Sequence, residues 1–188
     1  ATFDRAFDGL EPDLKLPDLA IPGKAKDLKG QSEFTKLAKD YLDVGYLEKL
    51  AGRGRELYAE HATALKRIER LTGVPGPIIL AIWGRETAFG GVKLPHDAIR
   101  VLATHAFIGQ RRARFRPELI YALKMLEDGI PREKLRSSWA GAVGQTQFMP
   151  SDFYTHAADG DGDGVADLVN SIPDALMSAA NQLKNNGW

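Results

Sequence analysis

Hydrophobic positions recur every three or four residues along most of the chain, which is the spacing of one helix face. The pattern predicts a helix that begins near Ser32, its N-cap, and a longer one over 55–71 that ends before Gly73. Pro77 suits the first turn of the next helix. Further helices are predicted over 96–107, 113–128, 150–157 and 172–185. Because strand patterns are few, we predict a mainly α fold.

The first 30 residues differ from the rest of the chain in composition. Proline and glycine interrupt their short apolar groups, at Pro12, Pro17, Pro22, Gly23 and Gly30. This composition predicts an extended arm over residues 1–30 that lies on the core and contains no helix. A length of 188 residues supports one substantial core but is short for two independent domains. Residues 31–188 are therefore predicted to form a single helical domain.

Charge and composition exclude several classes of function. Lys and Arg number 25, as do Asp and Glu, so no net field draws the chain toward nucleic acid or anionic lipid. No apolar run approaches the roughly 20 residues that span a bilayer. The chain has no cysteine, which excludes disulfides, thiol catalysis and thiolate zinc sites. The four histidines lack zincin spacing, and no nucleophile elbow or phosphate loop is present.

Glu86 continues an apolar stripe. In a helix, Ile79, Ile82, Trp83 and Glu86 share one face, so the carboxyl takes the place of a core side chain. Desolvation there raises the pKa of a carboxyl and makes it a candidate proton donor near neutral pH. The alternative is a glutamate at the exposed end of a helix, which is the usual position of this residue type. The stripe and the glycine-rich segments downstream favour the catalytic interpretation.

The segment from residue 137 to residue 150 combines small residues, amides and aromatics, without a helix or strand period. Gln145 and Gln147 offer paired donors and acceptors, and Trp139 and Phe148 offer flat rings to the apolar face of a sugar. This combination suits a groove for a neutral polymer that carries hydroxyl and amide groups. A glycine-rich turn between two helices is the alternative interpretation.

Residues 159–170 follow the pattern of an EF-hand loop, with Gly164 at its sharp turn. The predicted ligand positions are Asp159, Asp161, Asp163, Val165, Asp167 and Asn170. Four carboxylates within nine residues repel one another unless a cation neutralises them. Asn170 stands where a bidentate glutamate is usual, which lowers the expected affinity. We predict a structural calcium ion, with a metal-free Asp-Gly turn as the alternative.

Several motifs occur together and in a recognisable order, at 83–90, 140–151, 159–170 and the C-terminal Ala180-Asn181 and Asn186-Gly187-Trp188. Over about residues 30–188 the chain resembles the lytic murein transglycosylase B family. The resemblance implies a lysozyme-like fold of the goose-type and transglycosylase kind, with an inserted calcium loop. It also implies an exported or periplasmic protein, expected to be a monomer, whose partner is the glycan strands of peptidoglycan.

The resemblance also implies a mechanism. Glu86 would protonate the β-1,4 bond between N-acetylmuramic acid and N-acetylglucosamine and then act as base toward the muramic C6 hydroxyl, which leaves a 1,6-anhydro end. Ser138, Gln147 and Phe148 match positions that line the sugar groove; Gln147 would bind an acetamido group and Phe148 would stack. Ordinary glycosidases need two carboxylates, and Glu86 has no partner carboxylate in its own motif or in the glutamine-bearing segment.

The chain departs from the family pattern at both ends. Family members usually continue past the Asn-Gly-Trp with a Tyr-Asn motif, and they usually begin earlier, so we expect a trimmed form. Two other hypotheses follow: a catalytically impaired, calcium-stabilised peptidoglycan-binding module, and a hydrolytic muramidase. The chemistry of the product separates them from a lytic transglycosylase.

Overall fold

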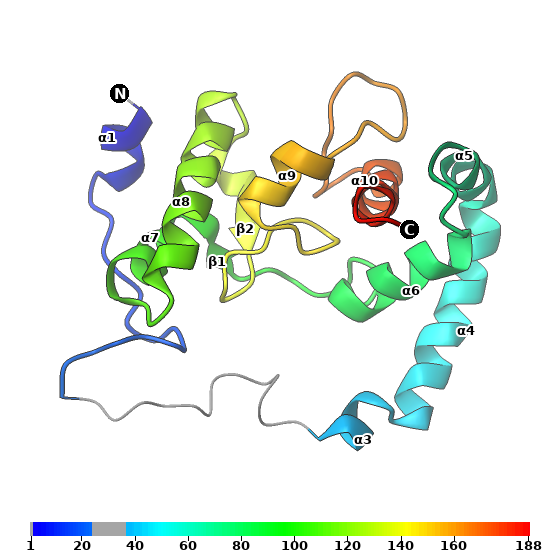
Figure 1. The fold of residues 1–188 in the computed structure, drawn as a ribbon, viewed down its shortest axis with the longest axis horizontal. Helices are drawn as coiled ribbons and strands as arrows, with labels where there is room; N and C mark the ends of the chain where they lie inside the picture. Colours follow the sequence, from blue (N-terminus) through cyan, green and yellow to red (C-terminus); the bar gives the residue numbers. More distant parts are fainter. Residues whose placement is uncertain (1, 24–36) are drawn as a thin grey trace. The chain divides into compact units, whose positions relative to one another are not determined.

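The computed structural model describes residues 2–23 and 37–188 and is mostly helical (Figure 1). The predicted N-cap Ser32 and the boundary between residues 30 and 31 lie outside the described residues. The chain forms two compact units that interleave along the sequence. Unit 1 takes its residues from Ala1–Tyr41, Leu94–Val143 and Met149–Ser151, and unit 2 from Leu42–Lys93, Gly144–Phe148 and Asp152–Trp188.

Unit 1 is built around two helices that pack side by side, α7 (Ala98–Ile108) and α8 (Arg112–Glu127). Two short antiparallel strands, β1 (His96–Asp97) and β2 (Arg136–Ser137), pair His96 with Ser137. The unit also contains α1 (Thr2–Phe7), α3 (Ala38–Tyr41) and the 3-10 turn η2 (Arg132–Lys134). The helix predicted over 96–107 begins at Ala98 instead, because Asp97 caps it by accepting a hydrogen bond from the amide of Arg100.

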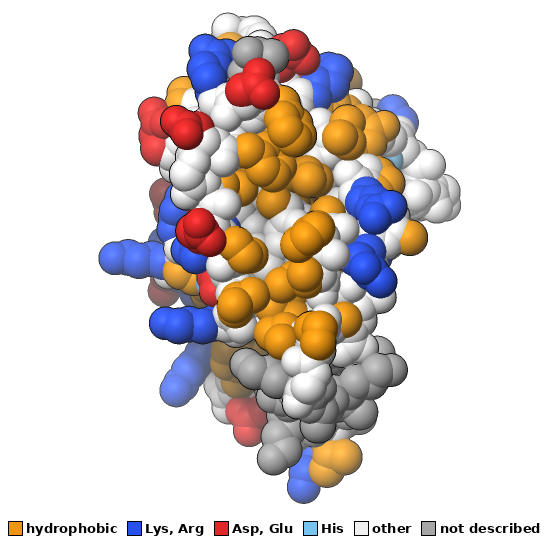
Figure 2. All heavy atoms as spheres, turned by 90° about the vertical axis from the view of Figure 1, so that its left-hand side faces the viewer, with side chains coloured by type: hydrophobic (Ala, Val, Ile, Leu, Met, Phe, Trp, Pro, Cys, Tyr) orange, Lys and Arg blue, Asp and Glu red, His pale blue; other side chains and the backbone are white. Residues whose placement is uncertain are grey.

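The prediction that residues 1–30 contain no helix was wrong over α1. The Phe3 and Phe7 rings stack one turn apart, with centroids 4.4 Å from each other, and Ala6 between them is buried. Contacts between residues four apart stabilise a helix even where neighbouring prolines disfavour one. Hydrophobic side chains gather on the face that carries α1 and the segment after it (Figure 2). The exposed apolar side chains of unit 1 include Phe3, Leu14 and Phe107.

Unit 2 contains α4 (Val44–Glu60), α5 (Ala62–Thr72), α6 (Gly76–Thr87), most of α9 (Pro150–His156) and α10 (Ile172–Asn185). The prediction of a single helix over 55–71 was wrong. Two helices occupy this region, because helical geometry is interrupted at His61, and the first of them begins at Val44. Asp43 accepts a hydrogen bond from the amide of Tyr46 and so caps that helix. Gly73 ends α5, as predicted, and it takes the left-handed conformation.

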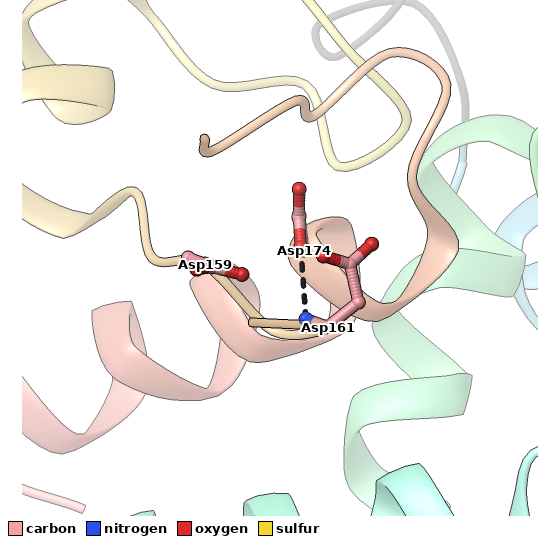
Figure 3. Close-up of side chains that lie close together, drawn as sticks. All are labelled: Asp159, Asp161 and Asp174. Carbon is pink, nitrogen blue, oxygen red and sulfur yellow. Dashed lines mark hydrogen bonds between the residues drawn. The ribbon is translucent and has the colours of Figure 1, made fainter. Parts of the chain in front are cut away.

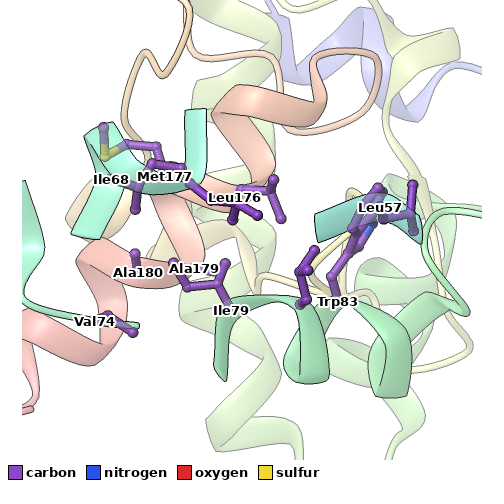
Figure 4. Packing of buried hydrophobic residues seen from close by; sticks show 11 residues of the cluster. Leu57, Ile68, Val74, Ile79, Trp83, Leu176, Met177, Ala179 and Ala180 are labelled. Atoms are coloured by element: carbon purple, nitrogen blue, oxygen red, sulfur yellow. The ribbon is translucent and has the colours of Figure 1, made fainter. Parts of the chain in front are cut away.

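The core of unit 2 is formed where α5, α6 and α10 meet (Figure 4). Ile79 and Trp83 of α6 are buried against it, together with Leu176 of α10. The spacing of these residues on their helices is the amphipathic period on which the helix predictions rest. No helix in the described part of the chain is both long and apolar enough to cross a bilayer.

Candidate active site

Glu86 lies in the last turn of α6 with its side chain exposed. The prediction that it occupies a buried apolar position was wrong. Ile79 and Trp83 on the same stripe are buried and Ile82 is half-buried, so the stripe reaches the surface at Glu86. A proton donor at the open end of a buried stripe is anchored by the core and remains accessible to a substrate.

The surroundings of Glu86 nonetheless favour its protonated form. Partial burial raises the pKa of the Glu86 carboxyl above its ordinary value, and the charge of Arg85 opposes this shift without cancelling it. Among the described residues, no other carboxyl perturbs the pKa of Glu86. No described residue donates a hydrogen bond to the Glu86 carboxyl. Within the described residues, Glu86 is therefore an acid whose pKa no neighbouring carboxyl shifts.

The chain after Glu86 takes three left-handed residues in succession, Ala88, Phe89 and Gly90, with φ values of 49°, 60° and 77°. Such angles are costly for residues with a Cβ and persist where the surroundings impose them. The Phe89 ring packs edge-on against Trp83, with centroids 5.5 Å apart. A Cβ on Gly84 would lie 2.6 Å from this ring, so the glycine makes room for it. The end of the acid-bearing helix is thus closely packed.

The glutamine turn (Gly144–Phe148) belongs to the same unit as Glu86. The Thr87 hydroxyl donates a hydrogen bond of 2.6 Å to the backbone carbonyl of Gln145. The indole Nε1 of Trp83 donates to Gln145 Oε1 at 3.0 Å, and Gln145 Nε2 donates to the carbonyl of Val169. We predicted that Gln145 binds substrate, whereas both ends of its amide contact the protein.

Gln147 and Phe148 occupy different environments. Gln147 is half-buried with a left-handed φ of 56°, and its Nε2 donates to the carbonyl of Gly144. Phe148 is 1% exposed and meets the His156 ring edge-on. The prediction that Phe148 stacks on a sugar is wrong for this conformation, because its ring face is not accessible. Gln147 keeps hydrogen-bonding capacity that a ligand could use.

Ser138 and Trp139 belong to unit 1. Both are half-buried. The Ser138 hydroxyl accepts a hydrogen bond from the amide of Ala142. Nε2 of His105 lies 3.0 Å from the carbonyl oxygen of Trp139, an acceptor, so this nitrogen carries the proton. Burial lowers the pKa of His105, which keeps the ring neutral.

The Asp-rich loop (residues 159–170) is held by its own carboxylates. Asp159 accepts hydrogen bonds from the amides of Gly162 and Gly164, and Asp163 accepts one from the amide of Val165. The bonds from Gly164 and Gly162 lower the pKa of Asp159, so it stays ionised. Asp167 accepts from the side-chain amide of Asn170. The loop therefore keeps negative oxygens close together, as a hard cation requires.

Sequence reasoning missed Asp174, which lies beyond the EF-hand pattern in the first turn of α10. Ligand oxygens of Asp159, Asp161 and Asp174 lie within 4.8 Å of one another (Figure 3). Asp174 is 1% exposed and accepts hydrogen bonds from the amides of Gly160, Asp161 and Asp167. A buried carboxylate is expensive unless it is compensated, and three amide donors together with a cation would compensate it.

An apolar pocket of about 620 Å³ lies between α4 and α6. Its α6 lining includes Ala81, Gly84 and Arg85, which share a face turned away from that of Glu86. No carboxyl is among its lining residues. The pocket is therefore unsuited to acid catalysis, despite its size.

Comparison with known proteins identifies the family. The family model described as "Transglycosylase SLT domain" matches residues 1–188. Over 137 residues the chain is 39% identical to membrane-bound lytic murein transglycosylase B of Escherichia coli (strain K12). This alignment covers 72% of the present chain and 38% of the Escherichia coli protein.

Solved structures give the same result. SltB3 from Pseudomonas aeruginosa, in complex with NAG-anhNAM-pentapeptide, aligns over all of this chain and 48% of its own, with a TM-score of 0.83 and 36% identity. Escherichia coli Slt35, in complex with calcium, aligns over 77% of this chain and 48% of its own, with a TM-score of 0.69 and 33% identity.

These matches confirm the predicted mainly α, lysozyme-like fold. The chain spans about half the length, or less, of the relatives that it matches. The family match covers all of it, with the acid-bearing helix and the glutamine turn inside the matched residues. The chain therefore belongs to the family of transglycosylase SLT domains.

Proposed function

We propose that this chain is a lytic transglycosylase that cleaves the β-1,4 bond between N-acetylmuramic acid and N-acetylglucosamine in peptidoglycan. The observation that carries the proposal is a single accessible acid, Glu86, with a raised pKa and no carboxylate partner among the described residues. A glycosidase that uses water needs a second carboxylate as base or nucleophile. A reaction in which the substrate supplies its own nucleophile needs only one.

The proposed reaction has two proton transfers through Glu86. The protonated carboxyl gives its proton to the glycosidic oxygen while the bond from that oxygen to C1 of the muramic sugar breaks. The C6 hydroxyl of the same sugar then forms a bond to C1, and the Glu86 carboxylate takes the hydroxyl proton. The product is a 1,6-anhydromuramic end, and Glu86 returns to its acid form.

A relative supports this chemistry. SltB3 was solved in complex with NAG-anhNAM-pentapeptide and also with NAG-NAM-pentapeptide. We infer that the present chain acts on the same class of glycan, which implies a periplasmic or exported location. We also propose that it acts as a monomer.

Three of the predicted substrate contacts remain proposals. Gln147 would bind an acetamido group, since its amide has free capacity and lies on the turn bonded to the residue after Glu86. Ser138 and Trp139, which are half-buried in unit 1, would contact the glycan through a hydroxyl and a ring face. Phe148, as a buried side chain, would support the glutamine turn that carries Gln147.

We propose calcium as the resident ion of the Asp-rich loop. The donor set is made of hard oxygens, which calcium prefers. Carboxylate oxygens of Asp159, Asp161 and Asp174 lie close together. Asp159, Asp161, Asp163, the carbonyl of Val165, Asp167 and Asn170 would hold the ion, with Asp174 as a further ligand. The ion would neutralise the loop and fasten it to α10. Binding of calcium by the related Slt35 supports the assignment.

Digestion of purified peptidoglycan sacculi, followed by mass spectrometry of the fragments, tests the function. The wild type should release anhydro-muropeptides, and Glu86→Gln should release fewer by orders of magnitude. Gln preserves the shape of the side chain, so glycan binding should persist in this variant. Hydrated reducing ends would make the protein a muramidase. Binding without cleavage by the wild type would make it a peptidoglycan-binding module.

A further inference from the structure

Gln145 has a protein partner for each of its four hydrogen-bonding groups. Its backbone amide donates to the carbonyl of Leu168 at 2.9 Å, and its backbone carbonyl accepts from the Thr87 hydroxyl at 2.6 Å. Its side-chain Oε1 accepts from Trp83, and its Nε2 donates to Val169, each at 3.0 Å. A residue that selects a sugar would be expected to leave such groups available for it.

Three of the four partners of Gln145 are buried, and the fourth, Val169, is half-buried. Trp83 is 1% exposed, Thr87 2% and Leu168 3%. A Cβ on Gly90 would lie 2.6 Å from Gln145 Oε1, so even a methyl group would displace the amide. Hydrogen bonds between such closely packed groups hold a single geometry, because each unmade bond would leave a buried polar atom without a partner.

Gln145 thereby connects three segments of unit 2 that carry proposed function. Thr87 directly follows Glu86, and Trp83 lies one turn earlier on α6. Gln147 lies two residues along the glutamine turn, and Leu168 and Val169 belong to the end of the Asp-rich loop. The acid, the amide proposed to hold substrate and the loop proposed to hold calcium therefore share one bonded residue.

We propose that Gln145 is a positioning residue, which fixes the end of α6, and with it Glu86, relative to the turn that carries Gln147. This inference rests on the proposed function and replaces the substrate-binding role predicted for Gln145. Proton transfer depends steeply on position, and a displacement of about 1 Å can cost about a hundredfold in rate. Loss of these bonds should therefore reduce the chemical step more than substrate binding.

Kinetics on a soluble glycan of alternating N-acetylglucosamine and N-acetylmuramic acid test the role. In Gln145→Leu, kcat should fall about tenfold or more while KM stays within about twofold. Thr146→Val is the matched control, because its buried hydroxyl has no partner among the described residues, and it should behave as the wild type. A raised KM with an unchanged kcat would show that Gln145 binds substrate and would overturn the proposal.

Thr87 gives a second test that does not depend on the folding of Gln145→Leu. Thr87→Val removes the hydroxyl that contacts both Gln145 and the amide of Gly90, and it should also lower kcat. Thr87→Ser restores the hydroxyl and should restore activity. Thr87→Val removes the bond to the backbone carbonyl of Gln145, and Gln145→Leu removes the bond from Trp83 to its side chain. Because both variants weaken the contact between α6 and the glutamine turn, the double variant should lose less than the product of the single losses. Full multiplicativity, or failure of serine to rescue, would contradict the proposal.

NMR provides a readout that needs no cleavage. The chain has three tryptophans, and only the indole N–H of Trp83 bonds to Gln145. In Gln145→Leu its signal should shift and exchange with solvent faster, while those of Trp139 and Trp188 should stay in place. An unmoved Trp83 signal would overturn the proposal. If the wild type proved unable to cleave glycan, the proposed function would fail, and this measurement would still decide whether Gln145 holds α6.

Discussion

At the scale of single residues, Glu86 combines access with a raised pKa. Its side chain is exposed, yet neighbouring atoms already desolvate it in part. A bound sugar chain would cover the carboxyl and exclude more water, which would disfavour the ionised form further. In the proposed reaction, substrate binding would therefore raise the pKa of the Glu86 carboxyl further.

The pH dependence of cleavage should report this acid. Because the pKa of Glu86 is raised and the reaction needs its protonated form, kcat/KM should fall as pH rises through that pKa. The midpoint should lie above the value of about 4.3 that is ordinary for glutamate. Initial rates on soluble glycan across a pH series measure it. A midpoint at or below the ordinary value would contradict the raised pKa.

Stability should depend on the same proton with a defined sign. A raised pKa means that the folded state binds the proton more tightly than the unfolded state does. The resulting stabilisation is present below the unfolded pKa and is lost as pH rises through the folded one. Glu86→Gln should therefore match the wild type in melting temperature at low pH and exceed it near neutrality. If Glu86→Gln and the wild type melted at the same temperature at both pH values, burial would not raise the pKa of this carboxyl.

Gln147→Ala should weaken substrate binding. The substitution leaves the acetamido group of the sugar without its proposed partner, which corresponds to about tenfold in affinity. Titration of glycan fragments into the Glu86→Gln background measures binding without turnover. Thr146→Val on the same turn is the control. Unchanged affinity would remove Gln147 from the set of substrate contacts.

At the scale of elements, the Asp-rich loop is fastened to α10 by hydrogen bonds. The Asp174 carboxylate, near the start of α10, accepts hydrogen bonds from the backbone amides of Gly160 and Asp167, which lie near the two ends of the loop. The Asp161 carboxylate also accepts a hydrogen bond from the Ser171 hydroxyl, which caps the same helix. An ion bound in the loop would therefore also stabilise the start of a helix whose other residues form the core.

Asp161→Ala should lower the melting temperature more in calcium than in chelator. Calcium that binds only the folded state raises stability by mass action, and loss of a ligand removes that gain. Asp8→Ala, which removes an equal charge from an exposed position outside the loop, should show no such difference. Thermal unfolding in calcium and in chelator measures both. A wild type that melts at the same temperature in both conditions would remove the calcium assignment.

Amphipathic periodicity predicted α6, α8 and α10, because each buries one face at regular spacing, but it joined α5 to the end of α4. It missed the first part of α4, where Gly45, Gly52 and Gly54 lower helix propensity. A Cβ on Gly54 would lie 3.6 Å from the Phe89 ring, which is an ordinary contact distance, so packing does not require a glycine there.

The parts of the candidate site that lie within one short motif could be predicted from the sequence. Glu86, Gln147 and the Asp-rich loop follow from local patterns. The burial of Phe148, the contacts of Gln145 and the approach of Asp174 depend on packing between segments far apart in sequence. Residue type alone does not distinguish an amide that binds a sugar from one that holds a helix.

At the scale of the whole molecule, α10 completes the core of unit 2. Leu176 has no exposed surface and packs with Ile79 and Trp83 in the same cluster. Leu176→Ala should cost about 3 kcal/mol of unfolding free energy through lost burial and a residual cavity. Leu71→Ala, at a site that is 54% exposed, should cost less than about 1 kcal/mol. Urea unfolding of both variants measures the difference, and equal losses would place Leu176 outside the core.

The interleaving of the units constrains how the protein is made. Unit 2 draws on three stretches of chain, the last of which starts at Asp152 and supplies α10. On the ribosome, the residues around Glu86 emerge long before the helix that closes their core, so they must wait with apolar surface uncovered. The acid-bearing segment can reach its final geometry only when translation has passed α10.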